Sequence, residues 1–458
     1  MDALPPELIS LVAEFLRDDD DSLRSLSLVA SRFTELAQRQ LFADVWLRRS
    51  RASGWMTYTA ALRHFDAYPR FLTYIKHVSV LPPYTSRSYS DETVEPALTA
   101  LMSAETALAA VLARIPHPGP QSALILHMEW GKLSPVARTA IEGIAERTTR
   151  EVSFRHVQTL PLHIILHCVR FCASMTFYCV ENIDRSAATT VNALLDMDTE
   201  ADAERLGLTS LYAAQSPELI ALLPPPTIRN LKFLHIEEQS KDIPEFLSLV
   251  RLSGCASTLE ELNLIYTSAL FRTNTRDTLP PHLPQLHTLR LTFRDIDFST
   301  MWDPPYSANL RVNFPETLCS LLHATSEQPW LVAPALRYLR INMRVFVLHR
   351  PPSDDDESTH KPTCVLPASS MAALDDLFVR YLDPHLRREE SRTTPLIDAG
   401  IELGVNVLVL YNTTSQEEHN EAMTAHREVV VDTLERGLAK ARSVGKGVKI
   451  VKWDGKDD

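Results

Sequence analysis

Hydrophobic residues near the start of the chain recur at steps of three and four, which places their side chains on one face of a helix. The row consists of Leu8, Leu11, Val12, Phe15 and Leu16. The tripeptide Pro5-Pro6-Glu7 precedes it. Proline at the first helical position and a carboxylate at the positive end of the helix dipole both favour a helix start. The pattern therefore predicts an amphipathic helix that begins within Pro5-Pro6-Glu7.

Two further short helices follow by the same reasoning. The last members of the acidic run at 18–21 can cap a second helix, and a third is expected to begin near Ser31. Their apolar positions are Leu23, Leu26, Leu28 and Val29 in the second helix and Phe33, Leu36 and Ala37 in the third. Three helices of this length bury little area, so the region should need a partner or a neighbouring domain for stability.

An ordered set of short apolar segments runs through these helices. It consists of Leu4-Pro5-Pro6-Glu7-Leu8-Ile9, Val12, Phe15-Leu16, the run from Leu26 to Phe33, Leu36-Ala37 and Leu41-Phe42. In this order and spacing the segments resemble the F-box. The chain departs from that family at Ala30, where cysteine is common, and at Phe33, where tryptophan is common, but both positions stay apolar. The resemblance implies docking on a Skp-type adaptor and, through it, on the cullin of a ubiquitin ligase.

The adaptor-binding residues expected on this basis precede the first helix or lie on the helices. They are Leu4, Pro5, Leu8, Ile9, Val12, Val29 and Phe33. Leu4 and Pro5 come before the first helix, whose inner face cannot easily cover them, so they form an apolar hook suited to a partner's pocket. The alternative is that all seven residues fill the core of a helical cap. Periodicity alone favours the cap, whereas the ordered segments favour docking.

A short pattern, apolar-x-x-apolar-x-apolar, recurs along the remaining chain. The clear copies begin at Leu231, Leu259, Leu286, Leu336 and Leu374, and weaker copies begin at Phe42, Ile75 and Leu208. The clear copies are separated by 28, 27, 50 and 38 residues, so a degenerate copy is expected within the step of 50. A period near 27 is typical of leucine-rich repeats, in which each copy supplies one strand and one helix.

These patterns predict an α/β protein with an N-terminal three-helix F-box at residues 1–47. An irregular leucine-rich-repeat-like strand–helix solenoid follows at 48–458, with an acidic loop insert at about 351–362. Further strands are expected at 124–128, 172–180, 405–410 and 448–453, and helices at 243–252 and 312–322. A doubly wound α/β domain is the alternative. With 12 glycines in all and no Gly-rich turn after a strand, the sequence favours the solenoid.

Composition narrows the class of function. The formal net charge of −12 disfavours a nucleic-acid binder, which must neutralise phosphates with clustered lysine and arginine. No apolar run reaches the roughly 18 residues of a membrane span, and the acidic N-terminus is unlike a secretory signal. Six cysteines without regular spacing form no disulfide framework. We therefore expect a cytoplasmic or nuclear protein without nucleic-acid or membrane partners.

Catalytic and metal chemistry have one candidate segment. Its residues are His156, His163, His167, Cys168 and Cys172. A zinc site usually needs a close-spaced ligand pair and a second pair elsewhere. The neighbours of these residues are strongly apolar, which favours buried thiols and hydrogen-bonded core histidines. We expect no catalytic residue, no cofactor and no metal. Gly445-Lys446-Gly447 lacks phosphate-loop spacing, and the acidic run at 354–357 reads as a solvated loop.

Three functional hypotheses remain at this level. The first is a non-catalytic substrate receptor of a Skp–cullin–F-box ligase, whose solenoid holds an unknown target protein. The second is a repeat scaffold in which residues 1–47 are a hydrophobic cap without a ligase. The third is a hydrolase or transferase that uses the histidine-rich segment, which would require a deep polar pocket near His163.

Overall fold

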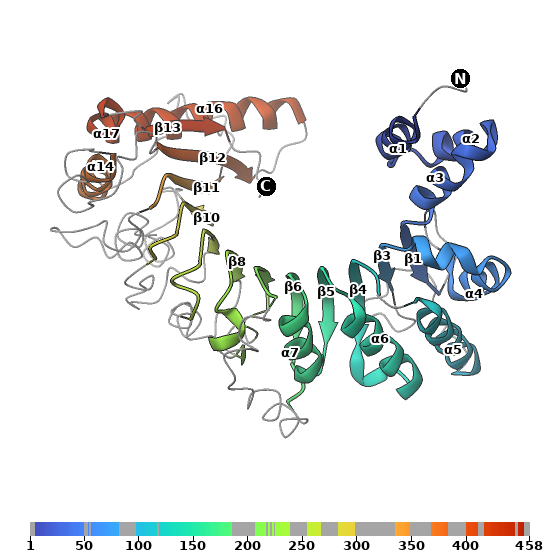
Figure 1. Cartoon of the computed structure of the whole chain (residues 1–458). Helices are drawn as coiled ribbons and strands as arrows, with labels where there is room; N and C mark the ends of the chain where they lie inside the picture. Colours follow the sequence, from blue (N-terminus) through green and yellow to red (C-terminus); the bar gives the residue numbers. More distant parts are fainter. Residues whose placement is uncertain are drawn as a thin grey trace, which may run out of the picture. The chain divides into compact units, whose positions relative to one another are not determined.

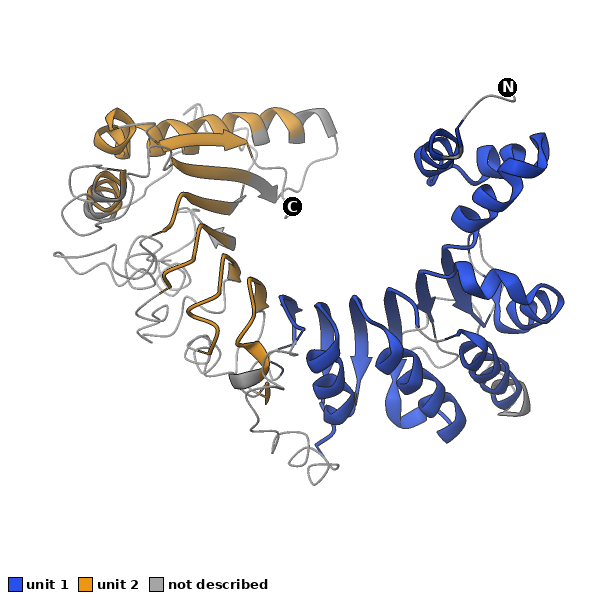
Figure 2. Ribbon diagram, viewed as in Figure 1, with its two compact units in different colours: residues 1–219 blue, residues 220–458 orange. Residues whose placement is uncertain are grey.

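The computed structural model divides the chain into two compact units, Met1–Leu219 and Ile220–Asp458 (Figure 2). Each unit contains helices and parallel β-strands, so the protein is of the mixed α/β class. The structure describes residues 5–49, 54, 56–81, 98–116, 119–185, 207–216, 219, 222–223, 225–238, 254–266, 283–297, 335–348, 368–382, 400–410, 416–444 and 448–452. The predicted domain boundary between residues 47 and 48 stays a prediction.

Unit 1 begins with the three helices expected from the sequence. They are α1 (Pro6–Phe15), α2 (Asp20–Val29) and α3 (Ser31–Leu41). Pro6 occupies the first turn of α1, and Asp19 caps α2 by accepting a hydrogen bond from the backbone N–H of Ser22 at 3.0 Å. Local start signals therefore set these helix boundaries.

Seven described strands form a parallel sheet in unit 1. They are β1 (Asp44–Arg48), β2 (Met56–Thr57), β3 (His77–Val80), β4 (Ser122–Glu129), β5 (Glu151–Gln158), β6 (Ser174–Glu181) and β7 (Ser210–Ala214). Their spatial order is β7-β6-β5-β4-β3-β1-β2. Strand β2 lies at the edge beside β1, so β3 also pairs with β1, and each strand after β3 lies beside the strand before it. A doubly wound sheet instead reverses its order near the middle, so this alternative does not describe unit 1.

Two rows of buried apolar side chains cross the sheet of unit 1 in register. The first row is Val45, Val78, Ala123, Val152, Met175 and Leu211. The second row, two residues further along each strand, is Leu47, Val80, Ile125, Phe154, Phe177 and Ala213. Because side chains alternate along a strand, both rows project from the same face of the sheet.

Helices lie along one side of the strands of unit 1 (Figure 1). They are α4 (Tyr58–Ala67), α5 (Leu98–Arg114), α6 (Pro135–Arg147) and α7 (Leu162–Phe171), with the short helices η1 (Pro69–Tyr74) and η2 (Trp130–Lys132). Helices α4 to α7 each contact the next. Arg147 fixes one contact, because its guanidinium donates to the carbonyl oxygens of Leu112 at 3.1 Å and Ile115 at 2.9 Å, at the end of α5.

Unit 2 continues the same scheme with six described strands in sequential, parallel order. They are β8 (Phe233–Glu238), β9 (Glu261–Tyr266), β10 (Thr288–Asp297), β11 (Tyr338–Leu348), β12 (Gly400–Leu410) and β13 (Val448–Lys452). One buried row is Leu234, Leu262, Leu289, Leu339, Ile401 and Val448. The helices among its described residues are η3 (Pro225–Ile228), α14 (Ala368–Leu382), α16 (Gln416–Gly437) and α17 (Ala439–Ser443).

Most of the predicted repeat copies are confirmed as strands. The clear copies that begin at Leu231, Leu259, Leu286 and Leu336 end in β8, β9, β10 and β11, and the three weaker copies end in β1, β3 and β7. In all four clear copies the first leucine is buried. The further candidates at 124–128, 172–180, 405–410 and 448–453 overlap β4, β6, β12 and β13. Strand β5 was not predicted.

Two predictions about the repeats are wrong. The copy that begins at Leu374 lies in helix α14, whose buried residues Met371, Leu374, Phe378 and Leu382 follow the helical spacing of three and four. No degenerate strand separates β10 from β11, because these two strands pair directly, with Leu289 opposite Leu339. The predicted helices at 243–252 and 312–322 and the acidic insert at 351–362 lie outside the described residues.

Candidate docking surface

Helix α1 has two apolar faces, and one of them packs against the other helices. On the packed face Ile9 and Ala13 are buried. Ala13 forms a core cluster with Leu23 of α2 and Ala37 of α3. The partly buried residues around that cluster are Leu16, Leu26, Leu36 and Leu41. Two of the three central residues are alanines, so this core is small.

The second apolar face of α1 is exposed to solvent. Leu8, Leu11 and Val12 are 46%, 58% and 45% exposed, and Phe15 is 90% exposed. At about 100° per residue these four side chains span an arc of about 100° beside the buried arc. The predicted row is therefore a real face, but four of its five members point away from the core. A helix with an apolar stripe this wide has more apolar surface than its own chain covers.

The end of α2 carries a second exposed apolar pair. Leu28 is 86% exposed and Val29 is 63% exposed. They were predicted to continue the stripe of Leu23 and Leu26, but α2 ends at Val29 and Ala30 is extended. Helix α3 begins at the next residue, and the Thr34 hydroxyl donates to the carbonyl oxygen of Ser27 at 2.7 Å. This tight junction leaves Leu28 and Val29 outside the core.

The seven predicted adaptor-binding residues fall into three groups. Pro5, Leu8, Val12 and Val29 are exposed, Ile9 and Phe33 are buried, and Leu4 lies outside the described residues. Burial gives Ile9 and Phe33 a packing role within the free chain. Sequence reasoning missed three exposed side chains of the same kind, Leu11, Phe15 and Leu28. The signal that could have found the first two is the width of the apolar stripe on α1.

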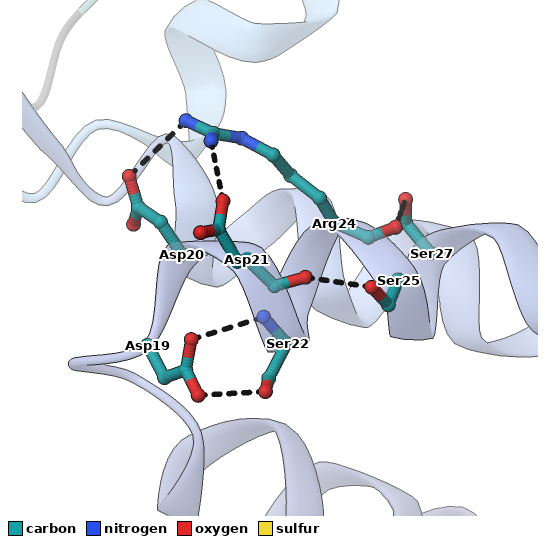
Figure 3. A network of polar contacts seen from close by, with 7 residues as sticks. All are labelled: Asp19, Asp20, Asp21, Ser22, Arg24, Ser25 and Ser27. Atoms are coloured by element: carbon teal, nitrogen blue, oxygen red, sulfur yellow. Dashed lines mark hydrogen bonds and ion pairs between the residues drawn. The ribbon is translucent and has the colours of Figure 1, made fainter.

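An acidic turn fixes the start of α2 (Figure 3). The Asp19 carboxylate accepts hydrogen bonds from the Ser22 backbone N–H at 3.0 Å and from the Ser22 hydroxyl at 2.6 Å. These two bonds lower the pKa of Asp19. Arg24 pairs with Asp20 and Asp21 one turn earlier in the helix. All these contacts join residues three or four apart, so they stabilise the start of α2, whereas the packing of this helix rests on Leu23 and Leu26.

An aromatic group ties the three helices to the first strands of the sheet. Phe42, directly after α3, stacks on Phe71 of η1 at 4.2 Å between ring centroids and on His64 of α4 at 5.2 Å. Burial in this group lowers the pKa of His64. Arg17 at the end of α1 lies 3.6 Å from Asp44 of β1. The helical region therefore packs on its own sheet through one face while its apolar row on α1 stays exposed.

The histidine- and cysteine-rich segment is divided by the fold. His156 lies in β5, whereas the other four residues lie in or directly after α7. His163 bonds to the Glu142 carboxylate at 2.7 Å, and Cys168 and Cys172 are fully buried. Hydrogen bonding to Cys172 and burial raise the pKa of the Cys168 thiol. The prediction of buried thiols is confirmed, and a raised thiol pKa disfavours the thiolate that a nucleophile or a metal ligand needs.

One polar chain across β1, β3 and β4 has the residue types of a hydrolytic triad. His77 Nδ1 lies 2.5 Å from Ser122 Oγ, and His77 Nε2 lies 3.9 Å from Asp44 Oδ1. Acyl transfer also needs N–H donors directed at the developing oxyanion. The Ser122 backbone N–H instead donates to the carbonyl oxygen of Lys76 at 3.1 Å. The geometry therefore supports a cross-strand link rather than a nucleophile.

A row of left-handed residues marks the carboxyl ends of four strands of unit 1. His127, His156, Cys179 and Gln215 have φ angles of 48°, 55°, 52° and 50°. This conformation is uncommon for residues with a side chain. The rings of His127 and His156 stack at 4.6 Å, and the Cys179 thiol donates to Gln215 Oε1 at 2.6 Å. Because adjacent strands contain the same left-handed residue at matching positions, the residues that follow it remain paired in register.

Charged pairs cross the strands of unit 2. Arg290 on β10 lies 3.4 Å from Glu261 on β9, and Arg340 on β11 lies 3.4 Å from Glu402 on β12. All four side chains are partly buried, and they alternate with the leucine rows along their strands. The face of the sheet opposite the leucines is therefore polar and charged in this unit.

Among the described residues, no three His, Cys, Asp or Glu side chains are grouped so that they could hold a metal ion. No helix in the described part of the chain combines the length and the apolar character needed to cross a membrane. No known family model matches the chain, and no curated protein matches its sequence significantly.

Proposed function

We propose that this protein is a substrate-recognition subunit of a Skp–cullin–F-box ubiquitin ligase. Its N-terminal helices dock on a Skp-type adaptor, and a leucine-rich-repeat-like solenoid binds a target protein. The chain itself performs no chemistry in this proposal. It raises the effective concentration of the target's lysines near the conjugating enzyme.

The exposed apolar face of α1 is the observation that supports docking most directly. Leu8, Leu11, Val12 and Phe15 share one face and stay exposed although the helix also has a buried face. Soluble proteins rarely leave clustered apolar side chains exposed unless a partner covers them. Covering apolar surface contributes roughly 25 cal/mol per Å² to a complex before the entropy cost of association is subtracted. The F-box resemblance of the same segment names the partner.

The structure changes which residues should touch the adaptor. Leu8, Val12 and Val29 keep their proposed contact role because they are exposed, and Pro5 stays beside them at the start of the helix. Ile9 and Phe33 act indirectly, since their burial holds the helices in place. Leu11 and Phe15 join the contact set because they belong to the same exposed face.

The sheet supports the second half of the proposal. In both units the strands are parallel and nearly sequential, and every described strand except β2 adds a residue to a buried apolar row of its own unit. Stacked strand–helix units of this kind complete one another's core, as in repeat proteins. Such surfaces suit the recognition of a protein target, whose identity depends on the polar side chains between the rows.

A scaffold without a ligase is the second candidate, and one contact favours it. The stack of Phe42 on Phe71 and His64 joins α3 to the start of the sheet, which is what a hydrophobic cap would require. A cap, however, gives no reason for the exposed face of α1. The two candidates therefore differ in what happens when that face is made polar.

Co-purification with a Skp-type adaptor tests the proposal. The double variant Leu8→Gln with Val12→Gln removes apolar side chains that contribute little to the free chain's core, so folding should persist. We expect adaptor binding to fall by at least about tenfold, because central apolar contacts carry most of the affinity of an interface. Near-normal binding would show that α1 is not the docking face.

A matched control uses exposed apolar residues of two other helices. Met102 on α5 and Val136 on α6 are both 58% exposed. The double variant Met102→Gln with Val136→Gln should leave adaptor binding unchanged. If the unaltered full-length chain recovers neither a Skp-type adaptor nor a cullin, the scaffold is the better account.

A further inference from the structure

The exposed apolar face of α1 has an acidic edge. Glu7 and Glu14 are both exposed and stand seven residues apart, so they lie about 10 Å apart along the same side of the helix. At about 100° per residue they border the apolar arc on the side of Leu11, away from the buried arc of Ile9 and Ala13. Ser10 lies between the acidic edge and the buried arc. The apolar face is thus bounded by carboxylates on one side and by the protein's own core on the other.

Ion pairs within the described part of the chain leave these two carboxylates unneutralised. Among the described residues neither Glu7 nor Glu14 forms an ion pair. Arg17, the nearest cation along the helix, lies 3.6 Å from Asp44 of β1. The acidic edge of α1 is therefore available to a partner's cations.

The apolar side chains on this face follow the spacing of a helix that lies in a groove. Leu8, Leu11, Val12 and Phe15 occupy positions i, i+3, i+4 and i+7, which is the anchor pattern of helix-in-groove recognition. A groove that holds a helix has two rims. On one side of α1 the other helices already occupy the space beside Ile9 and Ala13. The partner's free rim must lie along Glu7 and Glu14.

We propose that α1 docks in an apolar groove whose free rim carries lysine or arginine side chains that face Glu7 and Glu14. This inference rests on the proposed docking role of α1 and adds the charge of the partner's contact surface. The same acidic edge disfavours an anionic membrane or a nucleic acid as the occupant of this face, because both present phosphates. The rim contacts set the rate and the register of docking, while the apolar anchors set most of the affinity.

This inference is tested by measuring the affinity and the association rate of the adaptor and the full-length chain at two salt concentrations. The neutral double variant Glu7→Gln with Glu14→Gln should bind about three- to tenfold more weakly at about 50 mM salt, mainly through slower association. The difference should shrink at about 300 mM salt, where screening shortens the reach of exposed charges. Unaltered protein should itself bind more weakly at the higher salt.

Glu14→Lys separates a rim contact from an effect on folding. Glu14 lies near the end of α1, where the helix dipole favours a cation, so the substitution should stabilise the helix. Docking should nevertheless weaken by about tenfold at low salt, because a cation then faces the partner's cations. Glu421→Lys with Glu428→Lys is the control, since these exposed residues have the same spacing of seven on α16. The control should leave docking unchanged.

The outcomes are distinct. Loss of binding in Leu8→Gln with Val12→Gln, combined with salt-independent binding and no effect of Glu14→Lys, would overturn the basic rim and keep the docking face. Tighter binding of Glu14→Lys would indicate an acidic rim instead. No complex between the unaltered chain and any Skp-type adaptor would overturn both proposals together.

Discussion

The three N-terminal helices and the sheet of unit 1 differ in the exposure of their apolar side chains. In the sheet of unit 1, Phe154 and Phe177 are fully buried in adjacent strands. In α1 an equally large side chain, Phe15, is 90% exposed. Both regions belong to the same compact unit. Both regions therefore contain large apolar side chains, and they differ in whether the rest of the chain covers those side chains.

The difference follows from how each region completes its core. In strands β4, β5 and β6 the buried apolar residues lie beside the same rows in the neighbouring strands, so they meet partners from the same chain. The helical region has a core centred on Ala13, Leu23 and Ala37, which is too small to take up a second face. A region whose apolar surface exceeds its own core is suited to docking.

Replacing a phenylalanine in each region should give the largest contrast. Phe154→Ala leaves a cavity beside Phe177, whose ring lies 5.8 Å away, and should lower the free energy of unfolding by about 3–5 kcal/mol. Phe15→Ala should change it by less than about 0.5 kcal/mol, because the side chain is already in solvent. Urea unfolding followed by circular dichroism measures both. Equal losses would mean that Phe15 is covered in the free protein.

Enlarging the small core of the helices should have the next largest effect. Ala13→Leu adds three carbon atoms between α1 and the other helices and should destabilise the helical region by about 1–3 kcal/mol. Hydrogen exchange should show faster opening of α1 to α3, while the sheet of unit 1 stays protected. Leu11→Ala, on the exposed face of the same helix, is the control and should leave exchange unchanged.

Two aspartate caps extend the comparison to unit 2. Asp375, on α14, caps α17 across the fold by accepting from the backbone N–H groups of Ala441 at 2.8 Å and Lys440 at 3.3 Å. It is buried, so Asp375→Ala should cost about 1–2 kcal/mol. Asp19→Ala removes an exposed local cap and should lower the melting temperature less. A larger effect at Asp19 would show that the helical region depends on its cap more than on its core.

Acid should lower the free energy of unfolding by weakening the junction between the helices and the sheet. This is the smallest of the four expected effects on stability. Burial lowers the pKa of His64 and, as the largest influence, that of His77. The unfolded chain then binds protons at these sites more readily than the folded chain. Stability is complete above the unfolded pKa of about 6.5 and falls as pH drops below that value. Urea midpoints between pH 7.5 and 5 should decrease, and His64→Gln should reduce the decrease.

Local signals in the sequence were sufficient for the ends of several elements. Pro6 and Asp19 mark the starts of α1 and α2, and the recurrent leucines mark β8 to β11. Strand β5 was missed because Thr149 stands where the pattern has its first apolar residue, although Val152 and Phe154 follow it. The copy at Leu374 was wrongly assigned to a strand because its apolar spacing fits both the repeat pattern and a helix. Neighbours decide between the two structures, and the strand beside β11 proved to be β12.

The sequence was sufficient to predict the helix that carries the candidate site, but not which of its apolar side chains are exposed. The sequence determined that Leu8, Leu11, Val12 and Phe15 share one face of α1, because a helical period alone fixes which side chains point together. Tertiary structure decided that the neighbouring face of Ile9 and Ala13 is the buried one. That choice depends on Leu23 and Ala37, which meet Ala13 only when three helices pack together. Periodicity describes one helix, whereas burial is a property of the helices in contact.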